Sequence, residues 1–392
     1  MCSGTGWLYA LDAIELLDLE KSVGIIKLGT TWPLPVEFIQ KHLRPGSRVL
    51  VVEEVDPFIE VHLKEQMYDK WGGDELPKIY GKNTGHIRAV GELNPDNLID
   101  GIVKVLGVNY RGRNLSYDKK AKEHASKMTL ARQPIYCPGC PHRASMWIVK
   151  RVLRLEGTDG FVTGDIGCYA LDRYHGGQRV TRTQSAMGGG SGLASGFGKL
   201  EQFGFNQTVI AHCGDSTFFH AAIPAIINAV HHKSKTTYVV LDNSTTGMTG
   251  FQPHPGTLLD AIGDPAVPVD IEDLCRSLGC AVEVADPFDL EDAEQKLRDL
   301  VNREDTKVMI YRRKCGLIVF REEGPQYKVW VDEEKCFGEE CGCDRYCTRI
   351  FKCPALIWDK EAHKAKVDEA LCTGCGFCFK VCPQSAIVRE KI

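Results

Sequence analysis

Short apolar runs alternate with amphipathic stretches along most of the chain. Near the start, residues 23–28 and 48–52 are apolar runs of strand length, and residues 35–43 between them carry a helical pattern. A strand, a helix and a second strand in this order predict a β-α-β unit.

The same alternation resumes in the middle of the chain. Apolar strands are expected at 208–212, 237–241 and 307–311, with helix-like stretches between them. Strands that are buried on both faces read as continuous apolar runs. The pattern therefore predicts an α/β fold with a doubly wound parallel sheet and helices on both faces.

Changes of composition divide the chain into four predicted parts. Residues 113–134 are polar and charged, which predicts a linker with some helix, and nine of the seventeen cysteines lie between 336 and 382. The predicted parts are an α/β domain at 1–112, a linker at 113–134, a second α/β domain at 135–323 and a cysteine-rich α+β domain at 324–392.

The composition narrows the class of protein. The 392 residues have a net charge of −4, 43% hydrophobic and 26% charged residues, which is typical of a globular protein of two or three domains and favours neither nucleic acid nor an anionic membrane as partner. No apolar run is long enough to span a bilayer, and the N-terminal segment lacks the features of a signal peptide. We therefore expect a cytoplasmic protein in which the many cysteines are explained by metal binding rather than by disulfides.

The cysteine-rich segment contains the most specific motif. Cys372, Cys375, Cys378 and Cys382–Pro383 form C-x2-C-x2-C-x3-C-P. This is the spacing of bacterial ferredoxins, in which three close thiolates hold one [4Fe–4S] cluster and the fourth binds the neighbouring cluster. Zinc knuckles also use C-x2-C, but not four cysteines at this spacing followed by proline.

A degenerate copy of this motif precedes it, because VDEEKC at 331–336 recurs as VDEALC at 367–372. The first copy offers five cysteines for four places. We expect one cluster on Cys336, Cys347, Cys382 and either Cys343 or Cys341, with Cys343 favoured because it lies nearer to Cys347. The second cluster is expected on Cys353, Cys372, Cys375 and Cys378.

Polar residues follow two of the predicted strands. Gly214, Asp215 and Ser216 come after 208–212, and Asn243 and Thr245 come after 237–241. Ligands of open α/β sheets bind where parallel strands end, and oxygen ligands suit Mg²⁺. The spacing resembles the thiamine diphosphate motif, with Ser216 and Asp242 as departures, although two ordinary turns would have a similar composition. Glycine-rich turns around the motif suit a diphosphate, and they add Gly188, Gly189, Thr249 and Gly250 to the candidates.

These segments together resemble the alpha-subunit family of indolepyruvate ferredoxin oxidoreductases. The resemblance rests on CPGCPHR (137–143), DIGCY (165–169), GDSTFFH (214–220), LDNSTTGMTGFQPHPG (241–256) and the C-terminal cysteine motifs. It implies a transketolase C-terminal-like domain at 1–112, a diphosphate-type thiamine domain at 135–323 and two [4Fe–4S] clusters at 324–392. Mg²⁺ would be bound by Asp215, Asn243 and Thr245.

The resemblance also implies an activity and partners. Members of the family convert arylpyruvates such as indolepyruvate, with coenzyme A, to aryl-acetyl-CoA, CO2 and reduced ferredoxin. They begin with a pyrimidine-binding domain that supplies the catalytic glutamate. We expect this domain to be missing from the present sequence, so that either a separate subunit supplies it or the sequence is a fragment. A smaller gamma-type beta subunit and an external ferredoxin are the other expected partners.

A third cluster is expected inside the thiamine domain. Cys137, Cys140, Cys168 and Cys315 occur in the order and at separations resembling those of the cluster next to thiamine in related oxidoreductases. The alternative is a structural zinc half-site completed by His142.

Other roles remain open for several residues and for the whole chain. His142 and His254 are candidates for catalytic side chains or hydrogen-bonded loop histidines. Cys213, Cys275 and Cys280 are expected to be buried as small apolar residues. An oxidoreductase for another 2-oxoacid such as pyruvate, or a non-catalytic iron–sulfur subunit, would share most of these features.

Overall fold

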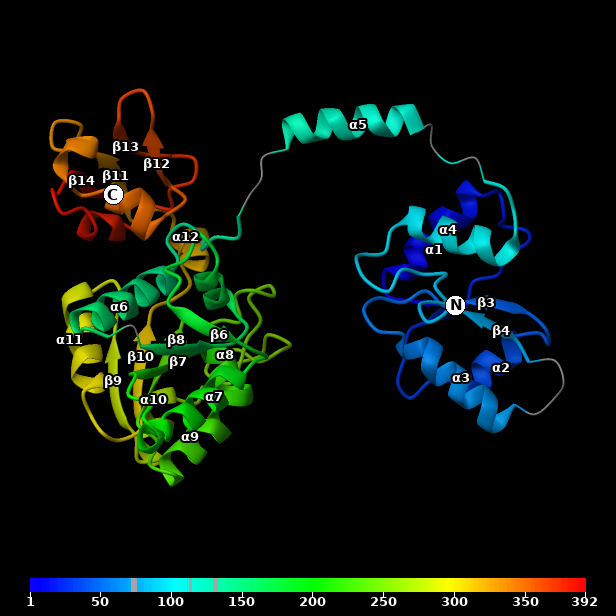
Figure 1. Cartoon of the computed structure of the whole chain (residues 1–392), viewed down its shortest axis with the longest axis horizontal. Coiled ribbons are helices and arrows are strands. Elements are labelled where there is room, and N and C mark those ends of the chain that lie inside the picture. The colour runs from blue at the N-terminus through cyan, green and yellow to red at the C-terminus, as the bar shows by residue number, and fades with distance from the viewer. Residues whose placement is uncertain (72–75, 111, 113–114, 130–132, 159) are drawn as a thin grey trace. The chain divides into compact units, whose positions relative to one another are not determined.

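The protein is described from a computed structural model. The structure describes the chain except residues 72–75, 111, 113–114, 130–132 and 159, and the side chains of Lys70, Glu340 and Cys341. The chain divides into two compact units, Met1–Leu130 and Ala131–Ile392 (Figure 1). The predicted linker at 113–134 begins and ends close to residues outside this description, and the helix α5, Leu115–Met128, lies within it.

The N-terminal unit is built from two short parallel strand pairs and the helices beside them. β1 pairs with β2 and β3 pairs with β4, and a parallel bridge between Cys2 and Val52 links them. The predicted strand at 23–28 is confined to its last two residues. The elements are β1 Cys2–Ser3, α1 Gly6–Leu16, β2 Lys27–Leu28, α2 Val36–His42, β3 Arg48–Leu50, α3 Phe58–Lys70, β4 Lys78–Tyr80 and α4 Pro95–Leu106.

A six-stranded parallel sheet forms the centre of the C-terminal unit, which confirms the predicted α/β fold. The strand order is β6-β5-β7-β8-β10-β9, and every pairing is parallel. β7 and β8, the strands that carry the predicted thiamine motif, are neighbours. The strands are β5 Phe161–Gly164, β6 Thr181–Gln184, β7 Val209–Gly214, β8 Thr236–Asp242, β9 Ala281–Ala285 and β10 Lys307–Arg312.

Both faces of this sheet are buried under helices. Side chains of a strand point alternately to the two faces, so Val239 and Leu241 pack on one side and Tyr238 and Val240 on the other. The first side is covered by α6 Pro141–Leu155 and α11 Leu290–Val301. The second is covered by α7 Gly189–Phe197, the π-helical turn η3 Phe218–Ala222, α9 Ile223–His231 and α10 Ile271–Ser277. Cys213, Cys275 and Cys280 lie in this second core, as expected.

The cysteine-rich segment forms two antiparallel strand pairs with short helical turns between them. β11 pairs with β14, and β12 pairs with β13. The internal repeat is visible in the hydrogen bonds, because Cys336 N donates to Asp332 O as Cys372 N donates to Asp368 O. The elements are α12 Gly316–Glu323, β11 Tyr327–Val331, η4 Gly338–Cys341, η5 Tyr346–Phe351, β12 Leu356–Asp359, β13 Lys364–Val367, η6 Phe377–Lys380 and β14 Ile387–Lys391.

Helix α6 joins the sheet to the cysteine-rich segment. Its residues Met146 and Val149 pack on the sheet, whereas Ala144 and Trp147 belong to the apolar core of the cysteine-rich segment. The Trp147 ring contacts Tyr346, Phe351 and Phe377 edge to face, with its Nε1 donating to Tyr346 Oη at 3.2 Å. The two parts therefore share one core and form one compact unit.

Replacing Trp147 by Ala should destabilise the C-terminal unit strongly. Truncating a buried tryptophan costs about 3–5 kcal/mol, which corresponds to a fall of roughly 6–15 °C in the anaerobic thermal midpoint for a unit of this size. Leu155→Ala, at the exposed end of the same helix, is the matched control and should shift the midpoint by less than about 2 °C. Equal shifts in the two variants would contradict the shared core.

Candidate functional site

A crevice at the carboxyl ends of β7 and β8 collects the polar residues predicted from the thiamine motif. Asp215 begins the helical turn after β7 and is 2% exposed, and Asn243 and Thr245 in the loop after β8 are both 4% exposed. Asp215 Oδ2 accepts hydrogen bonds from the backbone N–H of Asn243 at 3.0 Å and of Thr245 at 3.2 Å. The backbone therefore holds the carboxylate against the second loop.

Three oxygen acceptors meet at this point. Asn243 Oδ1 lies 3.2 Å from Asp215 Oδ2 and 2.7 Å from the carbonyl oxygen of Thr245. Two arrangements satisfy these acceptors: a cation bound among them, or an amide rotated so that its NH2 donates to both. In octahedral coordination at 2.0–2.1 Å, adjacent oxygen ligands are separated by about 3 Å. The donor set therefore fits Mg²⁺.

The residues around these oxygens are buried and polar. His142, at the start of α6, places Nε2 3.3 Å from Asn243 Nδ2, and burial lowers its pKa to about 4. His254 Nε2 lies 3.1 Å from Asp215 Oδ2 but outside hydrogen-bond geometry, so this nitrogen has no hydrogen-bond partner. Both predicted histidines thus face the candidate site, while His220 is exposed.

The predicted glycines and hydroxyls have different surroundings. A Cβ on Gly188 or Gly190 would overlap Ala221 or Gly164, so the 188–190 run permits close packing of α7. Gly214 is required because a Cβ there would lie 2.8 Å from the Tyr169 ring. Ser216 is buried beside Asp215. Gly189 stands at the start of α7, and Thr249 and Gly250 lie in an exposed turn closed by the Thr246–Gln252 bridge.

A buried network beneath the site was not identified from the sequence. Asp165 follows β5, is fully buried and accepts a hydrogen bond from Gly188 N at 2.8 Å. Tyr169 Oη donates to the Asp165 carboxylate and lies 3.0 Å from Thr217 Oγ1. Burial raises the pKa of Asp165 to about 6, against the effect of these hydrogen bonds. The DIGCY segment contains both Asp165 and Tyr169. Their spacing directly after a strand is the sequence feature that could have indicated this network.

Four cysteines predicted to form a third cluster are brought together beside the crevice. The pKa of Cys168 is raised to about 11, mainly by burial and in addition by the nearby Cys137 and Cys315. Burial raises the pKa of Cys140 to about 12, with Cys168 and Cys137 acting in the same direction. Cys315 N donates to Asn243 O at 3.0 Å, which joins these cysteines to the candidate Mg²⁺ residues.

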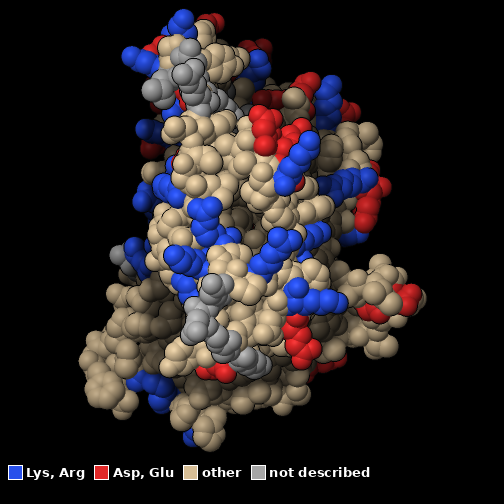
Figure 2. Space-filling view, turned by 90° about the vertical axis from the view of Figure 1, so that its right-hand side faces the viewer, with Lys and Arg blue, Asp and Glu red and all other residues tan. Residues whose placement is uncertain are grey.

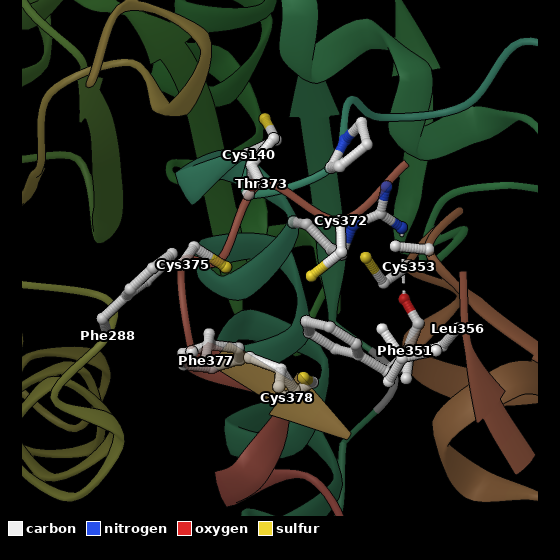
Figure 3. Close-up of a pocket in the computed structure, with 17 residues that line it drawn as sticks. Cys140, Phe288, Phe351, Cys353, Leu356, Cys372, Thr373, Cys375, Phe377 and Cys378 are labelled. Atoms are coloured by element: carbon white, nitrogen blue, oxygen red, sulfur yellow. Dashed lines mark hydrogen bonds between the residues drawn. The ribbon is translucent and has the colours of Figure 1, made fainter. Parts of the chain in front are cut away.

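Two further groups of cysteines each surround one cavity. Cys353, Cys372, Cys375 and Cys378 line the first together with Phe351 and Phe377, and their sulfurs enclose one space (Figure 3). Cys336, Cys343, Cys347 and Cys382 line the second, and the side chain of Cys341 lies outside the described residues. Both groups contain the cysteines expected from the crossed arrangement of bacterial ferredoxins.

The spacing of the thiols does not suit a single metal ion. Within the described residues, no three His, Cys, Asp or Glu side chains converge closely enough to bind one ion. A tetrahedral zinc at 2.3 Å from each sulfur requires such convergence, whereas a cubane holds its four thiolates at its corners, farther apart.

Other surfaces are less informative. Basic and acidic side chains are interspersed on the face shown in Figure 2, with no continuous surface of one sign. In the part of the chain that is described, every helix is too short or too polar to cross a membrane.

Comparisons with known proteins agree with this architecture. Residues 165–310 match the family "Thiamine pyrophosphate enzyme, C-terminal TPP binding domain", residues 365–388 match "4Fe-4S binding domain", and residues 1–112 match "Indolepyruvate oxidoreductase domain". The chain is thus a thiamine-diphosphate-type α/β protein with a ferredoxin-type iron–sulfur domain.

Individual relatives are similar to nearly the whole chain. The chain is 36% identical over 389 residues to "Indolepyruvate oxidoreductase subunit IorA" of Archaeoglobus fulgidus, and 34% identical over 409 residues to the protein of the same name from Pyrococcus horikoshii. These alignments cover 99% of this chain and 59% and 60% of the two relatives. The chain is similar to these two subunits over nearly its whole length, and it spans about 60% of the length of these relatives.

One solved structure is also similar. It is a 2-oxoglutarate:ferredoxin oxidoreductase from Magnetococcus marinus with 2-oxoglutarate, coenzyme A and succinyl-CoA bound. The match has 19% identity and a TM-score of 0.42, and it covers 48% of this chain and 66% of that chain.

Replacing Asp215 by Ala should abolish Mg²⁺-dependent binding of thiamine diphosphate, because the variant loses the carboxylate that faces the two other oxygens. Iron content should stay normal, since the cysteine cavities do not include Asp215. Thiamine and iron are to be measured on the same anaerobic preparation. Asp286→Asn, which alters a carboxylate paired with Arg313, is the control and should keep its thiamine. Unchanged thiamine occupancy in Asp215→Ala would remove Asp215 from the site.

Proposed function

We propose that the chain is a subunit or portion of a 2-oxoacid:ferredoxin oxidoreductase that acts on arylpyruvates such as indolepyruvate. With coenzyme A and two molecules of oxidised ferredoxin, the 2-oxoacid would yield aryl-acetyl-CoA, CO2, a proton and two molecules of reduced ferredoxin. The observation that carries this proposal is the position of Cys315, whose N–H is bonded to the carbonyl of Asn243 in the oxygen-lined crevice. The name of the relatives supports indolepyruvate as the substrate.

The chain's own residues would provide the binding site for thiamine diphosphate and Mg²⁺. When bound, thiamine diphosphate would supply the electron sink for decarboxylation. Asp215, Asn243 and the Thr245 carbonyl would hold Mg²⁺ and thereby the diphosphate. His142, kept neutral by burial, and His254, with an unpaired Nε2, would offer a proton donor or acceptor beside the diphosphate.

Electrons would leave through cysteine-bound clusters. Cys137, Cys140, Cys168 and Cys315 would hold a proximal [4Fe–4S] cluster next to the thiamine site. Cys353, Cys372, Cys375 and Cys378 would hold a middle cluster, whose cavity Cys140 also lines. Cys336, Cys343, Cys347 and Cys382 would hold a distal cluster. The place of Cys140, a proximal cysteine, in the lining of the middle cavity favours transfer in this order to an external ferredoxin.

The proposal requires partners. A pyrimidine-binding domain, on another subunit or in a longer form of the chain, would supply the glutamate that activates thiamine. A smaller gamma-type subunit would complete the complex. The term "subunit" in the name of the relatives supports an assembly of this kind.

Iron content tests the proximal cluster. Three cubanes correspond to about twelve iron atoms per chain, so Cys137→Ser and Cys315→Ser should each lower the content to about eight. Cys275→Ser, a buried thiol far from these groups in the second core, should keep about twelve. Full iron in both ligand variants, or stoichiometric zinc in the wild type, would refute the proximal cluster.

Activity tests the need for partners. The chain alone should not decarboxylate indolepyruvate in an anaerobic assay with coenzyme A and a viologen dye, because the proposal assigns the activating glutamate to the pyrimidine-binding domain. Addition of a partner that carries the pyrimidine-binding domain should restore turnover. Robust turnover by the isolated chain would contradict the proposal, and a preference for pyruvate in the complete enzyme would change the substrate class.

A further inference from the structure

Arg143 is a buried cation with no carboxylate partner. It lies in the first turn of α6, and the residue is 1% exposed. Its guanidinium donates only to backbone carbonyls, those of Tyr136, Gly176, Phe351 and Lys352, and its Nε has no partner. Within the described part of the chain, no Asp or Glu lies at ion-pair distance from it. The carbonyls satisfy most of its hydrogen-bond donors but provide no net negative charge.

Such an arrangement is costly unless an anion lies nearby. Removing a charge from water carries a large penalty, which a counter-charge normally offsets. Arginine cannot escape this penalty by losing its proton, because its guanidinium stays protonated in proteins. The structure should therefore contain a site that becomes negative beside Arg143 when the protein is complete.

The cavity lined by Cys353, Cys372, Cys375 and Cys378 meets this requirement. Arg143 lines the same cavity. Cys140, which is labelled in Figure 3, lines it as well. A [4Fe–4S] cluster held by four thiolates has a net negative charge, and it gains a further negative charge on reduction. The cavity is otherwise lined mainly by apolar side chains, among them Phe288, Val329 and Leu356, so the charges would interact through a poorly polarisable medium.

The surroundings of Arg143 add to the positive potential. Lys352, directly before Cys353, donates to the carbonyls of His175 and Gly177 and forms no ion pair with a described residue. The nearby carboxylate Asp172 already accepts hydrogen bonds from the backbone of Gln178, Val180 and Thr181 and from the Thr181 hydroxyl. These hydrogen bonds leave its negative charge in place, which acts on Lys352 through space, but Asp172 forms no ion pair with Arg143 among the described residues.

The distal cavity differs in this respect. It is lined by Arg345, whose guanidinium pairs with Glu339 at 3.7 Å and is 27% exposed. Its charge is therefore partly compensated and solvated. The unpaired, buried charge lines the middle cavity and not the distal one, and it also lies near Cys137 and Cys140 of the proximal group.

We propose that Arg143 is the fixed counter-charge of the middle cluster and raises its reduction potential relative to a neutral residue at this position. The inference rests on the proposed function, because it requires that Cys353, Cys372, Cys375 and Cys378 hold a cluster. One electron enters the cluster on reduction, no atom is transferred, and the guanidinium keeps its proton. Arg143 is thus not a ligand of the cluster. Its fixed positive charge stabilises the reduced state of the middle cluster.

Potentiometric titration of the full chain, followed by electron paramagnetic resonance, tests this inference. Arg143→Met removes the charge and keeps apolar bulk. We expect the equilibrium constant for reducing the middle cluster to fall at least tenfold in this variant, which lowers its reduction potential by 59 mV for one electron. Arg143→Lys keeps the charge and should stay much nearer to the wild type. Arg151→Met is the matched control on the same helix, because Arg151 pairs with Glu294 and lines neither cavity. The distal cluster is an internal control and should keep its potential in all three variants.

The outcomes separate the inference from the proposed function. If the reconstituted wild type shows no cubane signal, the proposed function fails. If it shows the signals and Arg143→Met has unchanged potentials, or Arg143→Lys shifts as far as Arg143→Met, only the counter-charge is refuted. If Arg143→Met and Arg143→Gln lose the middle cluster while Arg143→Lys keeps it, the requirement for charge is supported. Loss in all three variants would show that the carbonyl contacts matter instead, and would overturn the inference.

Discussion

The burial of helix α6 on two sides is the constraint on which the C-terminal unit depends. One side of α6 packs on the parallel sheet through Met146 and Val149, and the other enters the core of the cysteine-rich segment through Ala144 and Trp147. Its N-terminus consequently lies where the two parts meet. Cys140 there lines a cysteine cavity, and His142 faces the oxygen-lined crevice. Arg143 donates to a buried group of backbone carbonyls.

Close packing at this junction also sets how near the cysteine loops approach each other. A Cβ on Gly139 would lie 2.5 Å from Thr373 Oγ1, and one on Gly316 would lie 2.2 Å from Gly139 O. Gly139 is thus held between Gly316, which follows Cys315, and Thr373, which follows Cys372. Glycine at 139 and 316 allows backbone contact between loops that carry cysteines of the proximal and middle groups.

Burial governs the chemistry of these groups. It raises the pKa of Cys140 and of Cys375, to about 12 and about 11, and it lowers that of His142 to about 4. Each shift disfavours a charged side chain in a medium that solvates charge poorly. A bound cation would reverse this preference, since it would stabilise thiolates where iron binds and a carboxylate where Mg²⁺ binds.

The sequence alone determined the features that depend on neighbouring residues. The C-x2-C-x2-C-x3-C-P spacing, the 36-residue repeat and the apolar strands before Asp215 and Asn243 are local patterns, since chain connectivity keeps close residues close. The parallel sheet followed from the same patterns. The tertiary structure decided which distant residues meet, because folding free energy rather than connectivity brings Cys137 to Cys315 or Arg143 to the carbonyls of Phe351 and Lys352. Arg143 was part of a recognised segment, but its lack of a counter-ion is a property of its surroundings in three dimensions, which no local pattern encodes.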